Sequence, residues 1–359
     1  MAEAGSGGEG RVISILVHEF ATGGGLAEPD PPASWIAEGS AMRRAIVADF
    51  AAVPGVRVVS TLDARLPGEP DLPGEVVRVR ADREERTIRE LAARCDYSLM
   101  IAVETGGELS RLARWLEEGG RPSLGSSPGA IDRAGDKAAL GTHLAALGIP
   151  TPPSRVVVPG RPWDCPWGGP IVAKPVDGAG SIDTFVIPDP RRWPAPALAM
   201  ERALVQPYLP GDPMSASFLV DAAGRATPLA AGRQRIAVEG GRVEYRGGCL
   251  PVACGEADLR TVARAVDAVP GLRGLVGVDF LRDGEAGGVT ILEINPRPTT
   301  SYVGLSRIHA PGTIAAAWLA ACSGPLDGTP WPDRLRRVGQ GPCFRFAPDG
   351  TLVSEESPP

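Results

Sequence analysis

The sequence predicts an α/β domain with a doubly wound parallel sheet, followed by an α+β region. Between residues 11 and 128, short apolar segments alternate with helical segments, an order typical of parallel strands joined by right-handed crossovers. From about residue 150 onward, short strands follow one another in pairs, as in α+β lobes. The chain has 359 residues, 43% hydrophobic and 22% charged, which excludes wholesale disorder and allows roughly two or three domains.

The first domain is expected over residues 11–128, after a Gly-rich, polar and therefore loose N-terminus at 1–10. Apolar strands are expected at 12–17, 56–59, 76–79 and 97–103. Helices are expected at 35–53, 83–95 and 109–118, where apolar residues recur at helical spacing. These elements supply the parallel sheet and the helices that cover it.

The rest of the chain divides into a small lobe at 129–205, a large lobe at 206–325 and a C-terminal hairpin or tail at 326–359. In the small lobe, a helix at 132–147, ended by Gly148 and prolines, precedes strands at 155–158, 171–175, 181–187 and 203–206. The large lobe is expected to contain strands at 215–221, 227–235, 274–281 and 289–294, with helices at 256–269 and 313–322. The tail has turn signals around a strand at 343–346 and is expected to pack on the large lobe.

Charge and cysteine content exclude several classes of function. A net charge of -6 and a pI near 5.3 argue against a nucleic-acid or membrane partner held by bulk charge. No apolar stretch approaches the roughly 18 residues of a spanning helix. The first residues lack the basic and apolar regions of a signal peptide, so we expect a cytoplasmic protein. Six cysteines without a C-x-x-C pair, and three histidines, speak against a zinc cluster and favour free thiols.

Lysine and asparagine are rare in this chain. Lys137 and Lys174 are its lysines among 37 Lys and Arg residues, and Asn295 is its asparagine. A compact ammonium group is not replaced by a planar guanidinium where its size and hydration matter. We therefore expect these residues to mark a functional site, with survival by chance as the alternative.

The segment at 291–297 contains the most specific chemical signal. Alternate residues of a strand share a face, so Glu293 and Asn295 are expected to point one way, and Leu292 and Ile294 into the core. Asp279, in an expected neighbouring strand, adds another oxygen ligand. Such oxygens suit Mg²⁺, which completes its shell with water and substrate phosphates. The pattern predicts a magnesium site; acids on a solvated strand are the alternative.

Other segments supply groups suited to a nucleotide. Arg297 follows the metal strand and would grip a phosphate, and Lys174 ends an apolar strand. A loop of small residues follows, whose backbone N–H groups could surround phosphate oxygens, although it is not a Walker A loop. The loop consists of Gly178, Ala179, Gly180 and Ser181. A strand end between the lobes has backbone groups suited to an adenine edge, at Gln206, Pro207 and Tyr208.

In this order, the segments resemble the ATP-grasp superfamily over roughly residues 130–325. The resemblance implies ATP bound between two α+β lobes, behind an α/β preceding domain, with Mg²⁺ or Mn²⁺. It implies that Lys137 and Lys174 hold ATP phosphates under the small-residue loop, and that Arg297 meets the transferred phosphoryl group. Arg297 and Lys174 are thus the implied catalytic residues. The implied metal ligands are Asp279, Glu293 and Asn295. The segment 206–208 is implied to lie at adenine, although Pro207 stands where the family frequently has an acidic residue.

The resemblance also implies an activity, that of an ATP-dependent ligase forming carbon–nitrogen bonds. A carboxylate attacks the γ-phosphate, an amine then attacks the acyl phosphate, and the products are an amide, ADP and phosphate. The expected partners are small-molecule acid and amine substrates, without nucleic acid or membrane. A homodimer is left open.

Residues 16–25, 232–235, 245–248 and 295–305 further resemble the tyramine–L-glutamate ligases. Those enzymes join the γ-carboxylate of glutamate to tyramine on the way to methanofuran, and methylofuran is the analogous carrier in methylotrophic bacteria. The resemblance implies substrate contacts at Glu19, Gly23, Gly24, Gly25, Arg233, Arg235, Thr299, Thr300 and Ser301. For Glu19, an amine ligand and a loop cap are equal alternatives, and for the arginines the alternative is a surface cation.

Other functions stay open. The glycine run at 23–25 is not the G-x-G-x-x-G of a dinucleotide site, so that function is disfavoured. A second possibility is another amino-acid or peptide ligase of the D-alanyl-D-alanine or carnosine-like kind, or an enzyme that adds poly-glutamate. A third is a nucleotide-binding protein without catalysis, which the intact set of acids and cations speaks against.

Overall fold

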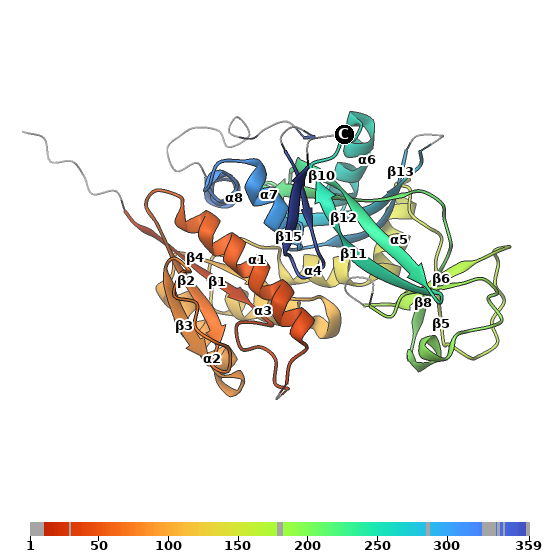
Figure 1. Ribbon diagram of the computed structural model, residues 1–359, viewed down its shortest axis with the longest axis horizontal. Helices are drawn as coiled ribbons and strands as arrows, with labels where there is room; N and C mark the ends of the chain where they lie inside the picture. Colours follow the sequence, from red (N-terminus) through yellow and green to blue (C-terminus); the bar gives the residue numbers. More distant parts are fainter. Residues whose placement is uncertain are drawn as a thin grey trace, which may run out of the picture.

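The computed structural model describes residues 11–28, 30–177, 182–284, 288–324, 335, 338–339 and 342–356. The N-terminal domain is a four-stranded parallel sheet in the order β3-β2-β1-β4 with helices packed on it (Figure 1). Its strands are β1 (Ile13–Glu19), β2 (Val56–Asp63), β3 (Glu75–Val79) and β4 (Tyr97–Ile101). Its helices are α1 (Ala33–Ala51), α2 (Glu84–Arg94) and α3 (Glu108–Glu118). The predicted parallel sheet is confirmed.

The helix expected at 132–147 is wrong as a single element, because two helices occupy this region. They are α4 (Pro128–Gly135) and α5 (Lys137–Ala146). Asp136 leaves the helical conformation, and its Oδ1 accepts hydrogen bonds from the backbone N–H groups of Ala138 and Ala139 at 3.0 and 2.9 Å. This N-cap begins a new helix at Lys137. Gly148, with φ of 65°, lies just after the second helix, as predicted.

A second sheet of 11 strands joins the two lobes, with its main path in the order β13-β12-β9-β10-β11-β7-β6-β8-β5. The small lobe contains β5 (Arg155–Val157), β6 (Ile171–Pro175), β7 (Phe185–Ile187) and β8 (Ala203–Pro207). The large lobe contains β9 (Asp212–Val220), β10 (Ala226–Glu239), β11 (Arg242–Leu250), β12 (Gly274–Arg282), β13 (Val289–Asn295) and α6 (Glu256–Asp267). The long hairpin β10–β11 reaches from the large lobe to the small one, where Arg242 pairs with Phe185 (Figure 1). Short 3-10 helices lie at η1 (Ala81–Arg83), η2 (Thr105–Gly107) and η3 (Ala195–Ala199).

A β-bulge interrupts the pairing of β12 with β13. Asp279 pairs with Glu293, whereas Phe280 pairs with Ile291, so Leu292 is the extra residue. Ile291 and Ile294 are therefore buried in the core, while Leu292 is only half-buried. The expectation that Leu292 points into the core is wrong, because simple alternation does not continue through a bulge. The bulge leaves Glu293 and Asn295 next to Asp279.

The N-terminal domain and the large lobe share one hydrophobic core. It includes Phe50 of α1 and Trp318, whose ring centroids are 5.5 Å apart. The large-lobe helices in this core are α7 (Tyr302–Ile308) and α8 (Thr313–Ser323). Asp49 of α1 accepts hydrogen bonds from the Tyr302 hydroxyl at 2.7 Å and from the backbone N–H of Gly312 at 2.6 Å. This buried carboxylate caps α8 from the neighbouring domain.

The C-terminal part forms the expected hairpin, with β14 (Cys343–Phe346) and β15 (Leu352–Glu356). Strand β14 pairs with β11, which places the hairpin against the large lobe. None of the helices in the described ranges is long and apolar enough to cross a membrane.

Candidate functional site

The centre of the site is an ion pair between Lys137 Nζ and Glu293 Oε2. Lys137 begins α5 and Glu293 lies on β13, and their side chains are only 9% and 11% exposed. Burial acts to lower the pKa of Lys137, but the charge of Glu293 outweighs it and raises that pKa. Burial acts to raise the pKa of Glu293, and the charges of Lys137 and Lys174 instead bring it to about 2. Both groups are therefore charged at neutral pH.

Asp279 lies beside Glu293 on the same face of the sheet. Gln234 Nε2 donates to Asp279 Oδ1 at 2.9 Å, and Asn295 Nδ2 approaches Oδ2 at 3.4 Å. Burial, and then the charge of Glu293, hold the pKa of Asp279 well above its usual value. Two buried carboxylates repel one another unless a proton or a cation lies between them. The structure thus brings the predicted metal ligands together.

The donor set fits a hard divalent cation. Two carboxylates and the side-chain amide of Asn295 supply oxygens, and Mg²⁺ prefers few protein oxygens completed by water and phosphate. No group of three or more His, Cys, Asp and Glu residues within the described ranges is arranged to hold a metal ion. A metal here would therefore depend on the amide of Asn295 and on ligands from a substrate.

Lys174 lies at the end of β6 and is half-buried near Lys137. Burial, and then the charge of Lys137, lower its pKa to about 8. Two neighbouring ammonium groups that are largely shielded from solvent favour a polyanionic ligand, since its negative charge would offset their repulsion. The loop expected to cover the phosphates, Gly178 to Ser181, lies outside the described residues. Its preceding residue Asp177 is held by the N-terminal domain, because the Thr105 hydroxyl donates to Asp177 O at 3.0 Å.

The strand β8 places the segment expected at adenine. Gln206 is buried and pairs with Val172, and Pro207 pairs with Ile171. Tyr208 is 48% exposed, and its backbone N–H donates to Pro170 O at 2.9 Å. The Tyr208 N–H is thus already paired with the residue that precedes β6. An adenine edge in this segment would need other backbone groups.

Arg297 meets a residue that the sequence did not indicate, Glu104 from the N-terminal domain. Arg297 Nε and Nη2 donate to the two carboxylate oxygens of Glu104 at 3.0 and 3.1 Å. Burial acts to lower the pKa of Arg297, but the charge of Glu104 raises it. Glu104 follows β4, at the carboxyl edge of the parallel sheet, where ligands of such sheets usually bind. This position after a parallel strand was the one feature of the sequence that could have indicated Glu104 as a site residue.

The polar residues after β13 form a short hydroxyl cluster. Thr299 Oγ1 and Ser301 Oγ are 2.8 Å apart, and Ser301 Oγ is 3.4 Å from Ser217 Oγ. The Thr300 hydroxyl instead donates to Glu38 of α1. Glu38 is a second residue of the N-terminal domain at the site that sequence analysis missed.

The residues expected to contact substrate near the first strand are engaged with the protein itself. Glu19 accepts hydrogen bonds from the Thr22 hydroxyl at 2.6 Å and the Thr22 backbone N–H at 2.8 Å, which is the loop-capping alternative. Burial raises the pKa of Glu19. A Cβ atom at Gly23 would lie 2.4 Å from Glu19 O, and one at Gly25 2.1 Å from the Phe20 ring. Close packing accounts for these glycines.

The arginines of β10 lie apart from the metal residues. Arg233 occupies the strand position beside Gln234 and so points to the opposite face, where its Nη2 is 3.8 Å from Asp212. Arg233 and Arg235 are both exposed. This is the placement of surface cations, the alternative that sequence analysis left open.

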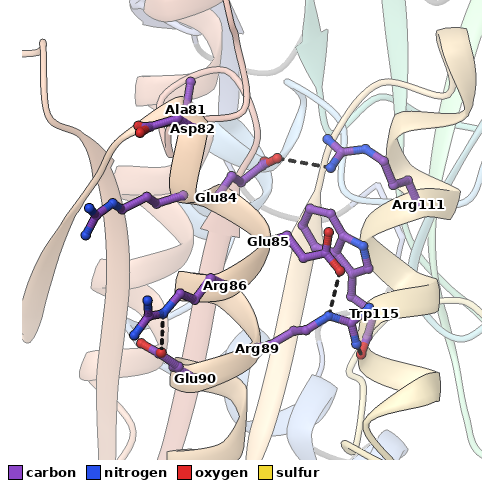
Figure 2. Close-up of a pocket in the computed structure, with 10 residues that line it drawn as sticks. Ala81, Asp82, Glu84, Glu85, Arg86, Arg89, Glu90, Arg111 and Trp115 are labelled. Atoms are coloured by element: carbon purple, nitrogen blue, oxygen red, sulfur yellow. Dashed lines mark hydrogen bonds and ion pairs between the residues drawn. The ribbon is translucent and has the colours of Figure 1, made fainter.

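A surface hollow on the N-terminal domain lies between α2 and α3 (Figure 2). Its charged side chains pair with one another, as in Arg86 with Glu90 at 2.8 Å and Arg89 with Glu85 at 2.9 Å. None of the residues that line it belongs to the lysine and carboxylate cluster. The hollow is therefore separate from the candidate active site.

Comparisons with known proteins agree with this geometry. Residues 134–301 match the ATP-grasp domain family, and residues 56–131 match the pre ATP-grasp 3 domain family. The chain is 30% identical over 241 residues to a tyramine–L-glutamate ligase of Methanocaldococcus jannaschii, covering 64% of this chain and 66% of that one. It is 31% identical over 212 residues to the Methanocaldococcus fervens ligase of the same name, covering 58% and 61%. The match thus spans less than two thirds of these relatives.

A solved structure from Archaeoglobus fulgidus, described as an ATP-grasp superfamily protein, has the same fold. It matches with a TM-score of 0.65 and 23% identity, covering 93% of this chain and 92% of that one. The two family matches follow each other along the sequence and include Lys137, Lys174, Asp279, Glu293 and Asn295. The chain contains an ATP-grasp domain at residues 134–301, with a pre-ATP-grasp domain ahead of it at residues 56–131.

Proposed function

We propose that the chain is an ATP- and Mg²⁺-dependent carboxylate–amine ligase. The observation that carries this proposal is the buried cluster of Lys137, Glu293 and Asp279 beside Lys174. Paired ammonium groups suit a polyphosphate, and paired carboxylates suit a divalent cation, so together they suit a metal–nucleotide complex. The ATP-grasp domain at residues 134–301 supports the same function.

The residues of the chain would act by positioning and by neutralising charge. Lys137 and Lys174 would bind phosphate oxygens, and Arg297 would stabilise the phosphoryl group in transfer. Bound Mg²⁺, or Mn²⁺ with the same oxygen ligands, would offset phosphate charge. A substrate carboxylate oxygen attacks the γ-phosphorus and ADP leaves. The amine nitrogen then attacks the acyl carbon, phosphate leaves, and the nitrogen gives up a proton to form the amide.

For the substrates, we propose the γ-carboxylate of L-glutamate and the amine of tyramine. Two relatives named for this reaction, at 30% and 31% identity, support this pair. The product would serve synthesis of a one-carbon carrier of the methanofuran or methylofuran type. We place the reaction in the cytoplasm, where ATP is available.

The test is ADP release from purified protein with Mg-ATP, L-glutamate and tyramine, together and singly. Release that needs both compounds, with a new product whose mass is their sum less water, is the expected result. ADP release with glutamate and another amine would support the ligase activity but rule out tyramine as the substrate. Formation of AMP and pyrophosphate would overturn the acyl-phosphate mechanism, and ATP binding without turnover across a broad panel would favour a non-catalytic protein.

A further inference from the structure

The N-terminal domain contributes two carboxylates to the site, and their partners differ. Glu104 is held by the guanidinium of Arg297 through two hydrogen bonds of 3.0 and 3.1 Å. Glu38, half-buried on α1, has one hydrogen-bond donor within the described part of the chain, the neutral hydroxyl of Thr300. No cation in that part pairs directly with Glu38.

The Glu38 carboxylate is close enough to Arg297 and Tyr245 for its charge to act on both. Burial acts to lower the pKa of Arg297, while the charges of Glu104 and then Glu38 raise it. Burial raises the pKa of Tyr245 on β11, and the charges of Asp279 and Glu38 raise it further. The Tyr245 side chain is thus within electrostatic reach of both the metal face and Glu38. The hydrogen bond from Thr300 places the Glu38 carboxylate on the side of α1 that meets the residues after β13.

The turn of the C-terminal hairpin packs near Glu38 and Thr300, against α1. Gly350, in the turn between β14 and β15, packs against Ala41 of α1, where a Cβ atom would lie 2.5 Å from the Ala41 side chain. The same atom would lie 3.7 Å from Thr300. The part of α1 that contains Glu38 and Ala41 therefore contacts both the residues after the metal strand and the turn of the C-terminal hairpin.

We propose that Glu38 binds the primary ammonium group of a substrate, with Thr300 orienting its carboxylate. Glu104 accepts hydrogen bonds from Nε and Nη2 of Arg297, and the Pro298 carbonyl accepts one from Nη1. Within the described residues the Glu38 carboxylate therefore has no cation of its own, and its charge suits one from a ligand. An ammonium group offers three donors and fits beside a hydroxyl. This inference rests on the proposed function. The ammonium belongs either to the α-amino group of the acid substrate or to the amine that attacks.

The test uses the full chain and the variant Glu38→Gln. Glutamine keeps the size of the side chain and an oxygen that accepts from Thr300, but it removes the charge. Calorimetric titration with L-glutamate and with tyramine, each with Mg²⁺ and a non-hydrolysable ATP analogue, measures both affinities. The deaminated counterparts are 2-hydroxyglutarate and 4-ethylphenol. We expect the variant to bind one of the two ammonium compounds about 10- to 100-fold more weakly than the wild type does. Its affinity for the deaminated counterpart of that compound should change less than about twofold. The compound whose affinity falls is the one whose ammonium group binds to Glu38.

A matched control removes a carboxylate of the same kind elsewhere. Glu118→Gln, on the exposed end of α3 where Glu118 pairs with Arg89, is expected to leave both affinities unchanged. An equal loss for an ammonium compound and its deaminated counterpart, or no loss for either, overturns the proposal. Nucleotide affinity is measured separately, and its absence would overturn the proposed function instead.

The proposed substrates, glutamate and tyramine, and the proposed ammonium subsite at Glu38 can be tested independently. If the protein binds the nucleotide but neither glutamate nor tyramine, a panel of amino acids and primary amines takes their place. If a panel compound binds to the wild type and binds more weakly to Glu38→Gln, the result supports an ammonium subsite at Glu38. The same result rules out glutamate and tyramine as the substrates. A panel in which no ammonium compound depends on Glu38 overturns the inference.

Discussion

Arg297 and Glu104 join the large lobe to the N-terminal domain through two hydrogen bonds of 3.0 and 3.1 Å. Their side chains are only 11% and 8% exposed. A buried charge whose partner is removed is strongly destabilising, because nothing replaces the lost solvation. The orientation of the arginine expected to meet the phosphoryl group therefore depends on a carboxylate from another domain.

Glu104→Ala should lower the free energy of unfolding by about 3–5 kcal/mol. It should also lower kcat about 100-fold, because the Arg297 guanidinium loses its orientation. Urea denaturation and ADP release measure the two effects. Glu104→Gln is expected to be milder in both, since its amide oxygen still accepts one hydrogen bond. If Glu104→Ala loses stability but retains full kcat in the folded fraction, the pair is only a bridge between domains.

ATP affinity should depend on pH through Lys174. Its pKa of about 8, set by burial and then by Lys137, means that free Lys174 loses its charge as the pH rises through 8. Phosphate favours the charged form, so ATP affinity should fall above pH 8, and binding should take up protons there. Calorimetric titration in buffers of different ionisation enthalpy measures both.

Variants of Lys174 separate charge from structure. Lys174→Met should abolish turnover while leaving the fold intact, as checked by circular dichroism. Lys174→Arg keeps a charge at every accessible pH, so its weaker ATP binding should lack the transition near pH 8. Full activity in Lys174→Met would contradict the nucleotide assignment.

The carboxylate pair should make two metal-site variants act in opposite directions on stability. The pKa of folded Asp279 lies above the unfolded value of about 3.9, so the metal-free protein loses stability as the pH rises above that value. Asp279→Asn removes the repulsion and should raise the metal-free Tm at pH 7.5, by roughly 2–4 °C per kcal/mol, while abolishing turnover.

Asn295→Asp should have the reverse effect on stability, because it adds a third carboxylate beside Glu293 and Asp279. Its metal-free Tm should fall, Mg²⁺ should recover part of the loss, and the magnesium dependence of turnover should change. Scanning calorimetry with and without Mg²⁺ gives these values. An unchanged magnesium dependence in Asn295→Asp would count against a ligand role for Asn295.

Local patterns in the sequence predicted most of the elements and the chemistry of the cluster. The apolar strands around Lys174 and Glu293 formed as expected, because their hydrophobic runs and their burial agree. The break at Asp136 and the bulge at Leu292 were missed, since a side-chain cap and an extra strand residue leave the hydrophobic pattern almost unchanged. Strand β11 was missed because two glycines interrupt its alternation.

Contacts between domains could not be predicted. Glu38 and Glu104 reach the site only because α1 and the end of β4 pack against the large lobe. Nothing in the local sequence of Glu38 distinguishes it from the other acids of the chain, and for Glu104 the signal is limited to its position after an expected strand. Sequence analysis therefore found the groups suited to phosphate and metal, but not the carboxylates that the N-terminal domain adds beside them.

Replacing Asp49 tests whether the junction between the N-terminal domain and the large lobe can be weakened without changing the nucleotide site. Its carboxylate accepts from the Tyr302 hydroxyl at 2.7 Å and from the backbone N–H groups of Gly312 and Ala315 at 2.6 and 3.1 Å. Asp49→Ala leaves these buried donors without an acceptor and should lower the free energy of unfolding by about 3 kcal/mol. Because Asp49 contacts no residue of the lysine and carboxylate cluster, the folded variant should keep the wild-type KM for ATP. A raised KM at 20 °C, where the variant stays folded, would show instead that the junction sets the geometry of the nucleotide site.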